Sequence, residues 1–220
     1  MSNPLRIFIG YDVRQPIAYN VLQYSIVANA SVPVHITPLV LNTIPIERTG
    51  LTQFTYSRYL VPYLCNYEGE ALFLDADMVV EGDIAELFKL IDPQCGVSVA
   101  KDKPRFEWPS LMLFNNGNCR RLSLAMIEKR VPQQLEEWSD YGIGTLPPEW
   151  NYCVGYNHEP IEPKLIHYTA GIPIWPETKD CKFADVWHKY HHKMNASVSY
   201  KDLMGGSVHV TKVESGEINK

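Results

Sequence analysis

The chain has 220 residues, of which 45% are hydrophobic and 20% are charged, a composition that suits one globular domain and excludes a disordered chain. The formal charge of −5 is spread without long runs, so no basic patch predicts general binding to nucleic acid or to a membrane surface. No stretch approaches the roughly 20 apolar residues of a membrane-spanning helix, and the first residues indicate a strand rather than a signal peptide.

Cysteine usage predicts the compartment. The number of cysteines is odd, and no two of them stand at the spacing of a zinc ligand pair. We therefore expect reduced thiols, a cytoplasmic protein and no zinc site. The cysteines are Cys65, Cys95, Cys119, Cys153 and Cys181.

The first forty residues predict a strand, a helix and a second strand. Residues 6–10 form an apolar run that ends at Tyr11 and Asp12, and residues 16–30 have apolar positions at helical spacing. The second strand covers residues 34–41, and its proline favours an edge or a bulge. This order opens many nucleotide-binding α/β domains, in which ligands lie at the carboxyl ends of strands.

The next elements are a helix and a short buried strand that carries two carboxylates. A helix is expected over residues 55–64, kinked by its proline, and residues 71–74 are an apolar run too short for a helix. Asp75 and Asp77 follow that run and project to the same side of an extended chain. Two hard oxygen ligands at one point suit Mg²⁺ or Mn²⁺ bound together with phosphate groups. The alternative is an ordinary acidic turn after a strand.

The remaining pattern alternates strands and helices. Asp83 is placed to cap a helix over residues 84–91. Strands are expected at residues 96–100 and 111–114, and a helix at residues 119–130. Residues 131–141 are polar and aromatic and could form a wall on the acceptor side of a binding site.

Four segments resemble the metal-dependent, retaining glycosyltransferases of family 8, which include glycogenin and the lipooligosaccharide galactosyltransferases. They are FLDADMVVEGDIAELF, TYSRYLVPYL, LPPEWNY and LIHYTAGIPIW. The resemblance implies an α/β protein with one domain of the GT-A fold, a Rossmann-like mixed sheet flanked by helices. We expect this domain to span residues 1–204 and a loosely held tail to cover residues 205–220, with the LPPEWNY segment as a strand that closes the sheet.

The resemblance also implies a set of metal ligands. In the family, the first aspartate of the triplet contacts the ribose and the metal, and the second binds the metal that bridges the diphosphate. These positions fall on Asp75 and Asp77. The third ligand is a histidine, which by position is His167; the alternative is a histidine of the core. The cofactor would be Mn²⁺, or Mg²⁺, and the donor a UDP-sugar.

Further residues are implied around the donor. An arginine of the helix before the metal strand reaches the donor in the family and corresponds to Arg58, although a lone arginine on a helix is usually solvated. Tyr11 and Asp12 match more loosely the residues around the uridine, and an ordinary turn is the alternative. Ala76, between the two aspartates, completes this part of the expected donor site.

The chain departs from the family at two points. An Asn-x-Gly triplet that contacts the sugar is replaced by Trp108-Pro109-Ser110; Trp108 either offers an aromatic face to the sugar or belongs to the core, and Ser110 joins the expected donor residues. The family lysine after the metal histidine is missing, so its role would pass to Arg58, Lys179, Lys182 or the metal alone.

These expectations describe a retaining transfer from a UDP-sugar to a glycan or another hydroxyl-bearing acceptor, with Asp140 and Asn151 on the acceptor side. One alternative is a non-catalytic protein that binds nucleotide sugars or glycans. The other is a metal-dependent phosphohydrolase, whose pattern requires a threonine where Val79 stands. Neither the donor sugar, the acceptor nor an oligomeric state follows from the sequence.

Overall fold

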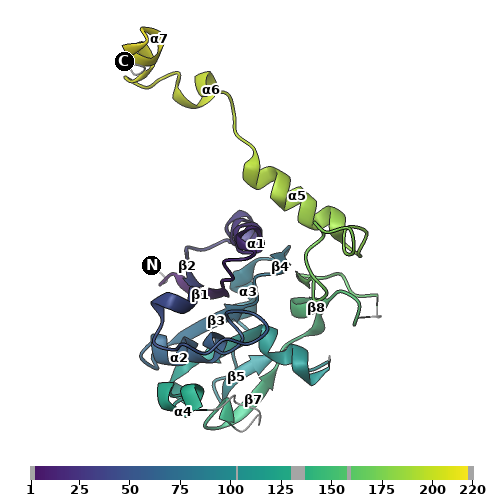
Figure 1. The fold of residues 1–220 in the computed structure, drawn as a ribbon. Helices are drawn as coiled ribbons and strands as arrows, with labels where there is room; N and C mark the ends of the chain where they lie inside the picture. The colour runs from purple at the N-terminus through teal and green to yellow at the C-terminus, as the bar shows by residue number, and fades with distance from the viewer. Residues whose placement is uncertain (1–2, 103, 130–136, 158–159, 218–220) are drawn as a thin grey trace.

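A computed structural model describes residues 3–102, 104–129, 137–157 and 160–217 (Figure 1). Its centre is a six-stranded mixed sheet with the order β2-β1-β3-β6-β5-β7. The strands are β1 (Leu5–Gly10), β2 (Val34–Leu39), β3 (Glu70–Leu74), β5 (Cys95–Val99), β6 (Leu111–Asn115) and β7 (Gly142–Thr145). The chain is therefore an α/β protein, as predicted.

The direction of the strands decides which loops meet. β1 pairs in parallel with both β2 and β3, so the chain leaves β1 and β3 at the same edge. β6 runs antiparallel to β3, with Leu111 opposite Leu74 and Asn115 opposite Glu70. The beginning of β6 therefore lies at the edge where β3 ends, and the end of β6 lies at the far edge.

A second, three-stranded sheet has the order β4-β9-β8. Its strands are β4 (Met78–Val80), β8 (Tyr152–Cys153) and β9 (Leu165–His167). Asp75, Ala76 and Asp77 are the residues between β3 and β4. The acidic triplet is thus the junction between the two sheets.

Helices flank the sheets, as Figure 1 shows. α1 packs against β4 and α5, and the Asn29 side chain joins all three by donating to Val80 O (2.9 Å) and to Tyr190 Oη (2.7 Å). The α-helices of the domain are α1 (Pro16–Asn29), α2 (Val61–Leu64), α3 (Ile84–Phe88), α4 (Leu124–Lys129) and α5 (Ala184–Asn195). Short 3₁₀ turns include Leu41–Thr43, Ser57–Leu60, Arg105–Ser110, Asn116–Asn118 and Pro148–Asn151.

The core explains why β3 is so apolar. Leu72, Phe73 and Leu74 have no exposed surface, because β3 lies between two strands and both of its faces are covered. Burial of such side chains contributes about 1.5–3 kcal/mol each. This packing holds the start of the acidic junction in a fixed place.

Three of the predicted helices have other bounds in the structure. The predicted helix over residues 55–64 is a 3₁₀ turn followed by α2, with Pro62 in the first turn of α2, where its missing N–H costs nothing. The predicted helix over residues 119–130 is shorter, because only Leu124–Lys129 is helical, and residue 130 lies outside the described residues. The helix that Asp83 caps ends at Phe88 rather than at residue 91.

The segment expected to close the main sheet belongs elsewhere. Pro147 and Pro148 have no N–H to donate to a strand ladder, and a 3₁₀ turn forms at Pro148–Asn151. The strand that follows is β8, which pairs with β9 in the second sheet.

The C-terminal part projects from the domain (Figure 1). The side chains are exposed from Asn195 to Leu203, so α6 (Tyr200–Met204), like α7 (Val210–Glu214), lies in the projecting segment. The predicted boundary at residues 204 and 205 falls within this segment. Among the described residues, no helix has the length and apolar character needed to cross a membrane.

Candidate active site

Asp75, Asp77 and His167 come together where the two sheets meet. β4 and β9 are antiparallel with Met78 opposite His167, and Tyr168 N donates to Asp77 O at 2.9 Å. This register brings His167 Nε2 to 3.3 Å from Asp77 Oδ1. One ligand atom from each of the three residues lies within 4.8 Å of the other two. The structure thus brings together the three residues expected to bind the metal.

The polar atoms of this cluster fit a divalent cation. Asp75 Oδ1 and Asp77 Oδ1 are both buried and accept no hydrogen bond of good geometry, although Arg58 Nη2 lies 3.1 Å from the first oxygen and His167 Nε2 lies 3.3 Å from the second. Burying carboxylate oxygens without such partners is costly unless a positive charge compensates them. Two carboxylates and one imidazole form a donor set suited to Mn²⁺ and acceptable to Mg²⁺.

The protonation of the cluster reflects its burial. Burial raises the pKa of Asp75 to about 7, although the nearby Arg58 charge opposes the shift. Burial alone would lower the pKa of His167, but the Asp77 carboxylate outweighs it and holds the pKa well above its usual value. Both groups therefore retain protons near neutral pH, and a metal ion has to displace them.

Arg58 is buried beside the acidic junction. Its Nη2 lies 3.1 Å from Asp75 Oδ1, its Nη1 donates to Pro109 O at 2.9 Å, and its guanidinium lies 5.3 Å from the ring centre of Phe73. The alternative of a solvated surface charge is wrong, since Arg58 is 8% exposed. Arg58 joins Asp75 to the turn at Arg105–Ser110.

A pocket of about 280 Å³ opens next to Asp77 at the ends of β1 and β3. Of the expected donor residues, Asp12 and Ala76 line it together with Asp77. Tyr11 instead packs edge-on against Tyr19, with ring centres 5.4 Å apart. The complete lining is Asp12, Arg14, Gln15, Thr52, Phe54, Ala76, Asp77 and Trp175.

Arg14 is a cationic residue of this pocket that the sequence did not indicate. Its Nε and Nη2 donate to the Asp12 carboxylate at 2.9 and 2.6 Å. This side-chain bond is the main reason why the pKa of Asp12 falls to about 2. Arg14 stands two residues after Asp12, just beyond the buried strand β1. This spacing of an acidic and a basic residue is the sequence signal that could have identified Arg14.

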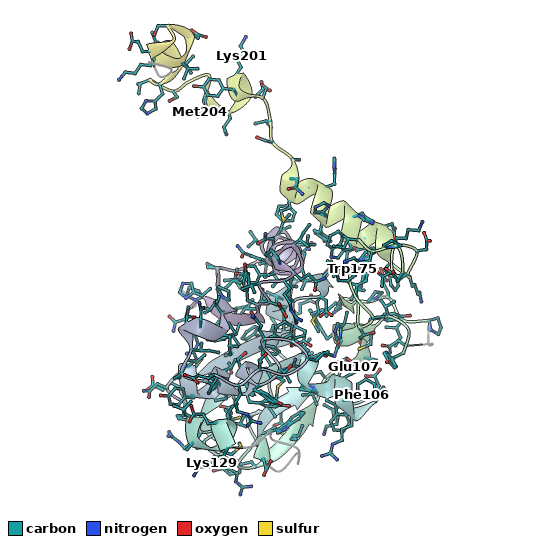
Figure 2. The ribbon with its side chains drawn as sticks, viewed as in Figure 1. Phe106, Glu107, Lys129, Trp175, Lys201 and Met204 are labelled. Carbon is teal, nitrogen blue, oxygen red and sulfur yellow. The ribbon has the colours of Figure 1, made fainter. Side chains whose placement is uncertain are left out.

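The turn after β9 brings an aromatic wall to the pocket. Gly171 has a φ of +114°, and a Cβ at this position would lie 2.7 Å from the Trp175 ring. Only glycine allows both the backbone conformation and this close approach. Figure 2 shows Trp175 on the same side of the domain as Glu107, with Lys129 at the end of the domain remote from α5.

Ser110 and Asn151 lie behind the acidic junction. Asn151 Nδ2 donates to Ser110 Oγ at 3.0 Å, and Asp75 N donates to Ser110 O at 2.9 Å. Asn151 is fully buried, so it supports the junction from inside rather than facing an acceptor. Trp108 is half-buried and packs against the core, and neither it nor Ser110 lines the pocket.

Asp140 is not brought to this site. Its backbone N donates to Asn118 O at 2.7 Å, and its Oδ2 accepts from Arg120 N at 2.6 Å. Both partners follow the end of β6, which lies at the far edge of the sheet because β6 is antiparallel to β3. The expectation that Asp140 faces the acceptor is therefore corrected. Residues 131–136 of the expected acceptor wall lie outside the described residues.

The lysines considered as substitutes for the family lysine lie away from the pocket lining. Lys182 Nζ donates to Tyr152 Oη at 2.7 Å and lies over the rings of Tyr152 and Phe183. Lys179 is exposed. Arg14 is thus the cation that the structure adds at the pocket.

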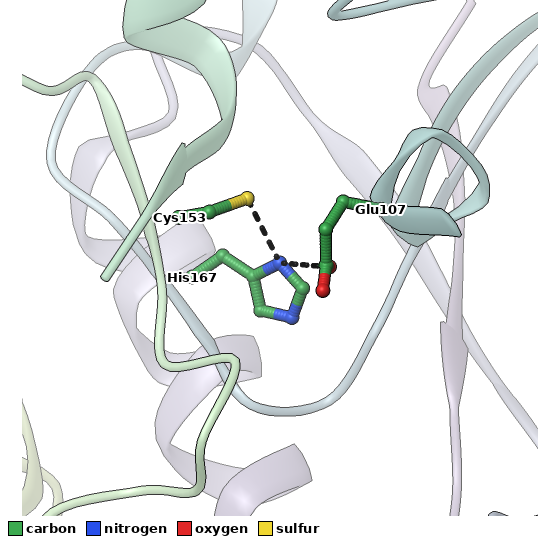
Figure 3. Close-up of side chains that lie close together, drawn as sticks. All are labelled: Glu107, Cys153 and His167. Carbon is green, nitrogen blue, oxygen red and sulfur yellow. Dashed lines mark hydrogen bonds and ion pairs between the residues drawn. The ribbon is translucent and has the colours of Figure 1, made fainter. Parts of the chain in front are cut away.

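Two further residues adjoin His167 (Figure 3). Cys153 Sγ lies 3.6 Å and Glu107 Oε2 lies 3.7 Å from His167 Nδ1. Neither was predicted, because Glu107 belongs to a turn that the sequence did not indicate and Cys153 follows the segment 146–152 that was expected in the main sheet. Their proximity depends on long-range pairing, which no local motif encodes.

The chain is similar to known proteins in sequence. No protein-family model matches it. It is 34% identical to "Protein CDI" of Arabidopsis thaliana, covering 84% of this chain and 85% of that protein. It is 23% identical to "Glycosyltransferase GlyE" of Streptococcus pneumoniae serotype 4 (strain ATCC BAA-334 / TIGR4), covering 64% of this chain but only 41% of GlyE.

Solved structures share the fold. The crystal structure of GlyE superposes with a TM-score of 0.62 at 18% identity, covering 85% of this chain and 60% of GlyE. Galactosyltransferase LgtC, solved with donor and acceptor sugar analogs, superposes with a TM-score of 0.61 at 11% identity, covering 90% of this chain and 99% of LgtC. These similarities establish the GT-A fold. Because it is 34% identical to Protein CDI over most of both chains, the chain belongs to the same family as that protein.

Proposed function

We propose that this protein transfers a sugar from a UDP-sugar to a hydroxyl group of a glycan or another acceptor, with retention of the anomeric configuration. The observation that carries the proposal is the cluster of Asp75, Asp77 and His167 beside the pocket of about 280 Å³. Retention is implied by the resemblance to family 8. Mn²⁺, or Mg²⁺, would be held by these three side chains.

The pocket has features that suit a nucleotide diphosphate. Phe54 and Trp175 supply aromatic surface, and Arg14 supplies a guanidinium whose Nε and Nη2 are bound to Asp12, which leaves Nη1 for a phosphate oxygen. Val13 and Gln53, which neighbour the lining residues in sequence, line a second pocket of about 650 Å³. The volume of this second pocket falls within the range of small-molecule sites.

The roles of the side chains follow from their positions. The bound cation would supply a Lewis acid for the charge that develops on the leaving diphosphate. Arg58 would hold Asp75 in place through its contacts with that carboxylate and Pro109 O. Arg14, at the pocket, would take the phosphate-neutralising role of the absent family lysine. We infer that the acceptor hydroxyl attacks from the side of the leaving group, with its proton passing to a backbone or phosphate oxygen.

The phosphohydrolase alternative has less support. The threonine that its pattern requires is replaced by Val79, whose side chain is fully buried in β4. No hydroxyl is available there. The non-catalytic alternative keeps the same fold and site, and activity distinguishes it.

Incubation with a panel of UDP-sugars, with and without Mn²⁺, tests the function. We expect Mn²⁺-dependent release of UDP, slow with water and faster with a suitable acceptor. Release of inorganic phosphate would indicate a phosphohydrolase, and tight binding without release of UDP would indicate a non-catalytic protein. NMR of the new glycosidic linkage tests retention.

A further inference from the structure

His167 turns its two ring nitrogens toward two different sets of side chains. Nε2 lies 3.3 Å from Asp77 Oδ1. Nδ1 lies 3.6 Å from Cys153 Sγ and 3.7 Å from Glu107 Oε2 (Figure 3). The proposed function uses only the first set.

The strand register places the second set. Cys153 and His167 are directly paired residues in the parallel strands β8 and β9, so their side chains project to the same face of the small sheet. Cys153 N donates to Asn157 Oδ1 at 2.7 Å, which fixes the backbone of the thiol residue. Glu107 approaches from the opposite wall, on the turn at Arg105–Ser110.

The spacing of these atoms matches that around a tetrahedral metal ion. Ligand atoms bound to one zinc ion at about 2.0–2.3 Å stand roughly 3.3–3.8 Å from one another. The two distances to His167 Nδ1, 3.6 and 3.7 Å, fall within that range. Ligand atoms of all three residues lie within 4.8 Å of one another.

The chemistry of the set points to a different ion from the one proposed for the acidic junction. A thiolate with an imidazole and a carboxylate favours a thiophilic ion such as Zn²⁺ or Cd²⁺, whereas Mn²⁺ and Mg²⁺ prefer oxygen ligands. Three protein ligands leave the fourth position to water. The lack of cysteine pairs at zinc-ligand spacing argues only against a site built from neighbouring cysteines. The three ligands of this site come from three separate elements.

We propose that Glu107, Cys153 and His167 Nδ1 form a second metal site, for a thiophilic divalent ion, whose occupation antagonises metal binding at the acidic junction. A neutral imidazole has one lone pair on its ring nitrogens. Coordination through Nδ1 leaves a proton on Nε2, which then donates to Asp77 and cannot bind Mn²⁺. The antagonism rests on the proposed function of the acidic junction, but the binding of the thiophilic ion does not.

Cadmium titration of the full chain without Mn²⁺ tests the site directly. We expect the ultraviolet absorption of one cadmium–thiolate bond per chain in the wild type and its loss in Cys153→Ser. Glu107→Gln should retain the absorption but bind Cd²⁺ about tenfold more weakly or worse. Cys181→Ser, which changes a half-buried thiol on another segment, should behave like the wild type. Persistence of the absorption in Cys153→Ser, or its loss in Cys181→Ser, would overturn the proposal.

If Cys153→Ser fails to fold, cadmium-113 NMR of the wild type shows without any variant whether a cysteine sulfur binds the ion. A single resonance in the range of sites with one sulfur ligand supports the proposal, and a shift typical of oxygen and nitrogen ligands alone contradicts it.

Water-proton relaxation by Mn²⁺ tests the antagonism. One equivalent of Zn²⁺ should weaken Mn²⁺ binding by about tenfold or more in the wild type and by less in Cys153→Ser. Equal weakening in both proteins would mean direct competition at the acidic junction and would reject the antagonism. If the wild type binds cadmium at this site but has no transferase activity, the second metal site stands and the proposed function is wrong.

Discussion

Asp77 and His167 face each other across the antiparallel pair β4 and β9, with Oδ1 and Nε2 3.3 Å apart. They are far apart in sequence, and only the pairing of Met78 with His167 brings them together. The same strand β9 pairs with β8 on its other side. The small sheet thus places both Asp77 and Cys153 beside the histidine.

Protons should compete with metal at the acidic junction. The pKa of Asp75 is raised by burial to about 7, and that of His167 is also raised, so Mn²⁺ must displace protons below neutral pH. We expect affinity to increase from about pH 6 to about pH 8, by up to about tenfold per pH unit for each proton displaced. Calorimetric titration with Mn²⁺ measures this, and an affinity independent of pH would contradict it.

The same shift predicts how stability without metal depends on pH. The pKa of Asp75 in the folded state exceeds its ordinary value of 3.8, so the folded protein binds more protons than the unfolded chain between that value and about 7. The contribution of Asp75 to stability is therefore fully present below the ordinary value and is lost as the pH rises toward 7. Unfolding by denaturant at several pH values, with and without Mn²⁺, should show this loss only without the metal.

Arg58→Lys should lower turnover. One ammonium cannot keep both the Asp75 contact at 3.1 Å and the bond to Pro109 O at 2.9 Å. Loss of one charge-assisted contact costs roughly 1–3 kcal/mol, which corresponds to a decrease in kcat of about fivefold to 150-fold. Arg58→Ala should also destabilise the fold, because it leaves Asp75 buried without its partner. Wild-type kcat and thermal stability in both variants would place Arg58 outside the site.

Arg14→Ala should weaken the binding of a UDP-sugar. Arg14 lines the pocket and has a guanidinium suited to phosphate oxygens, whereas Lys179 is exposed and does not line it. We expect an increase in Kd of about tenfold or more for Arg14→Ala, as charge-assisted contacts are lost. Lys179→Ala is the matched control and should bind normally. Calorimetry with UDP measures both Kd values. A larger increase in Kd for Lys179→Ala than for Arg14→Ala would mean that Lys179, rather than Arg14, contacts the phosphates.

Gly171→Ala should destabilise the protein and weaken donor binding together. The residue has a φ of +114°, and the added methyl group would lie 2.7 Å from the Trp175 ring. The expected cost is about 1–3 kcal/mol of unfolding free energy, measured by denaturant titration. Gly206→Ala is the control, since no atom lies within 4 Å of a Cβ built there. Similar stabilities of the two variants would contradict the proposed constraint on Trp175.

Local patterns predicted the parts of the site that lie close together in sequence. Asp75 and Asp77 follow the buried strand β3, and alternation along an extended chain was enough to place them together. His167 was predicted through a motif resemblance and by the need for a third ligand. The α/β class followed in the same way from alternating strands and helices.

Long-range pairing was not predictable from those patterns. Asp140 was expected near the site, but the antiparallel direction of β6 carries its partners to the far edge. Glu107 and Cys153 meet His167 only because a 3₁₀ turn and the register of β8 with β9 bring them there. Arg14 reaches the pocket through its bonds with Asp12.

Release of UDP from UDP-sugars in the presence and absence of Mn²⁺, measured for the wild type and for Asp77→Asn with folding checked by circular dichroism, tests the proposed metal site and transfer together. Asparagine removes one negative ligand with almost no change in volume. We expect UDP release by the wild type that depends on Mn²⁺ and a folded variant that releases almost none. Near wild-type release by Asp77→Asn in Mn²⁺ would contradict the assignment of the metal site.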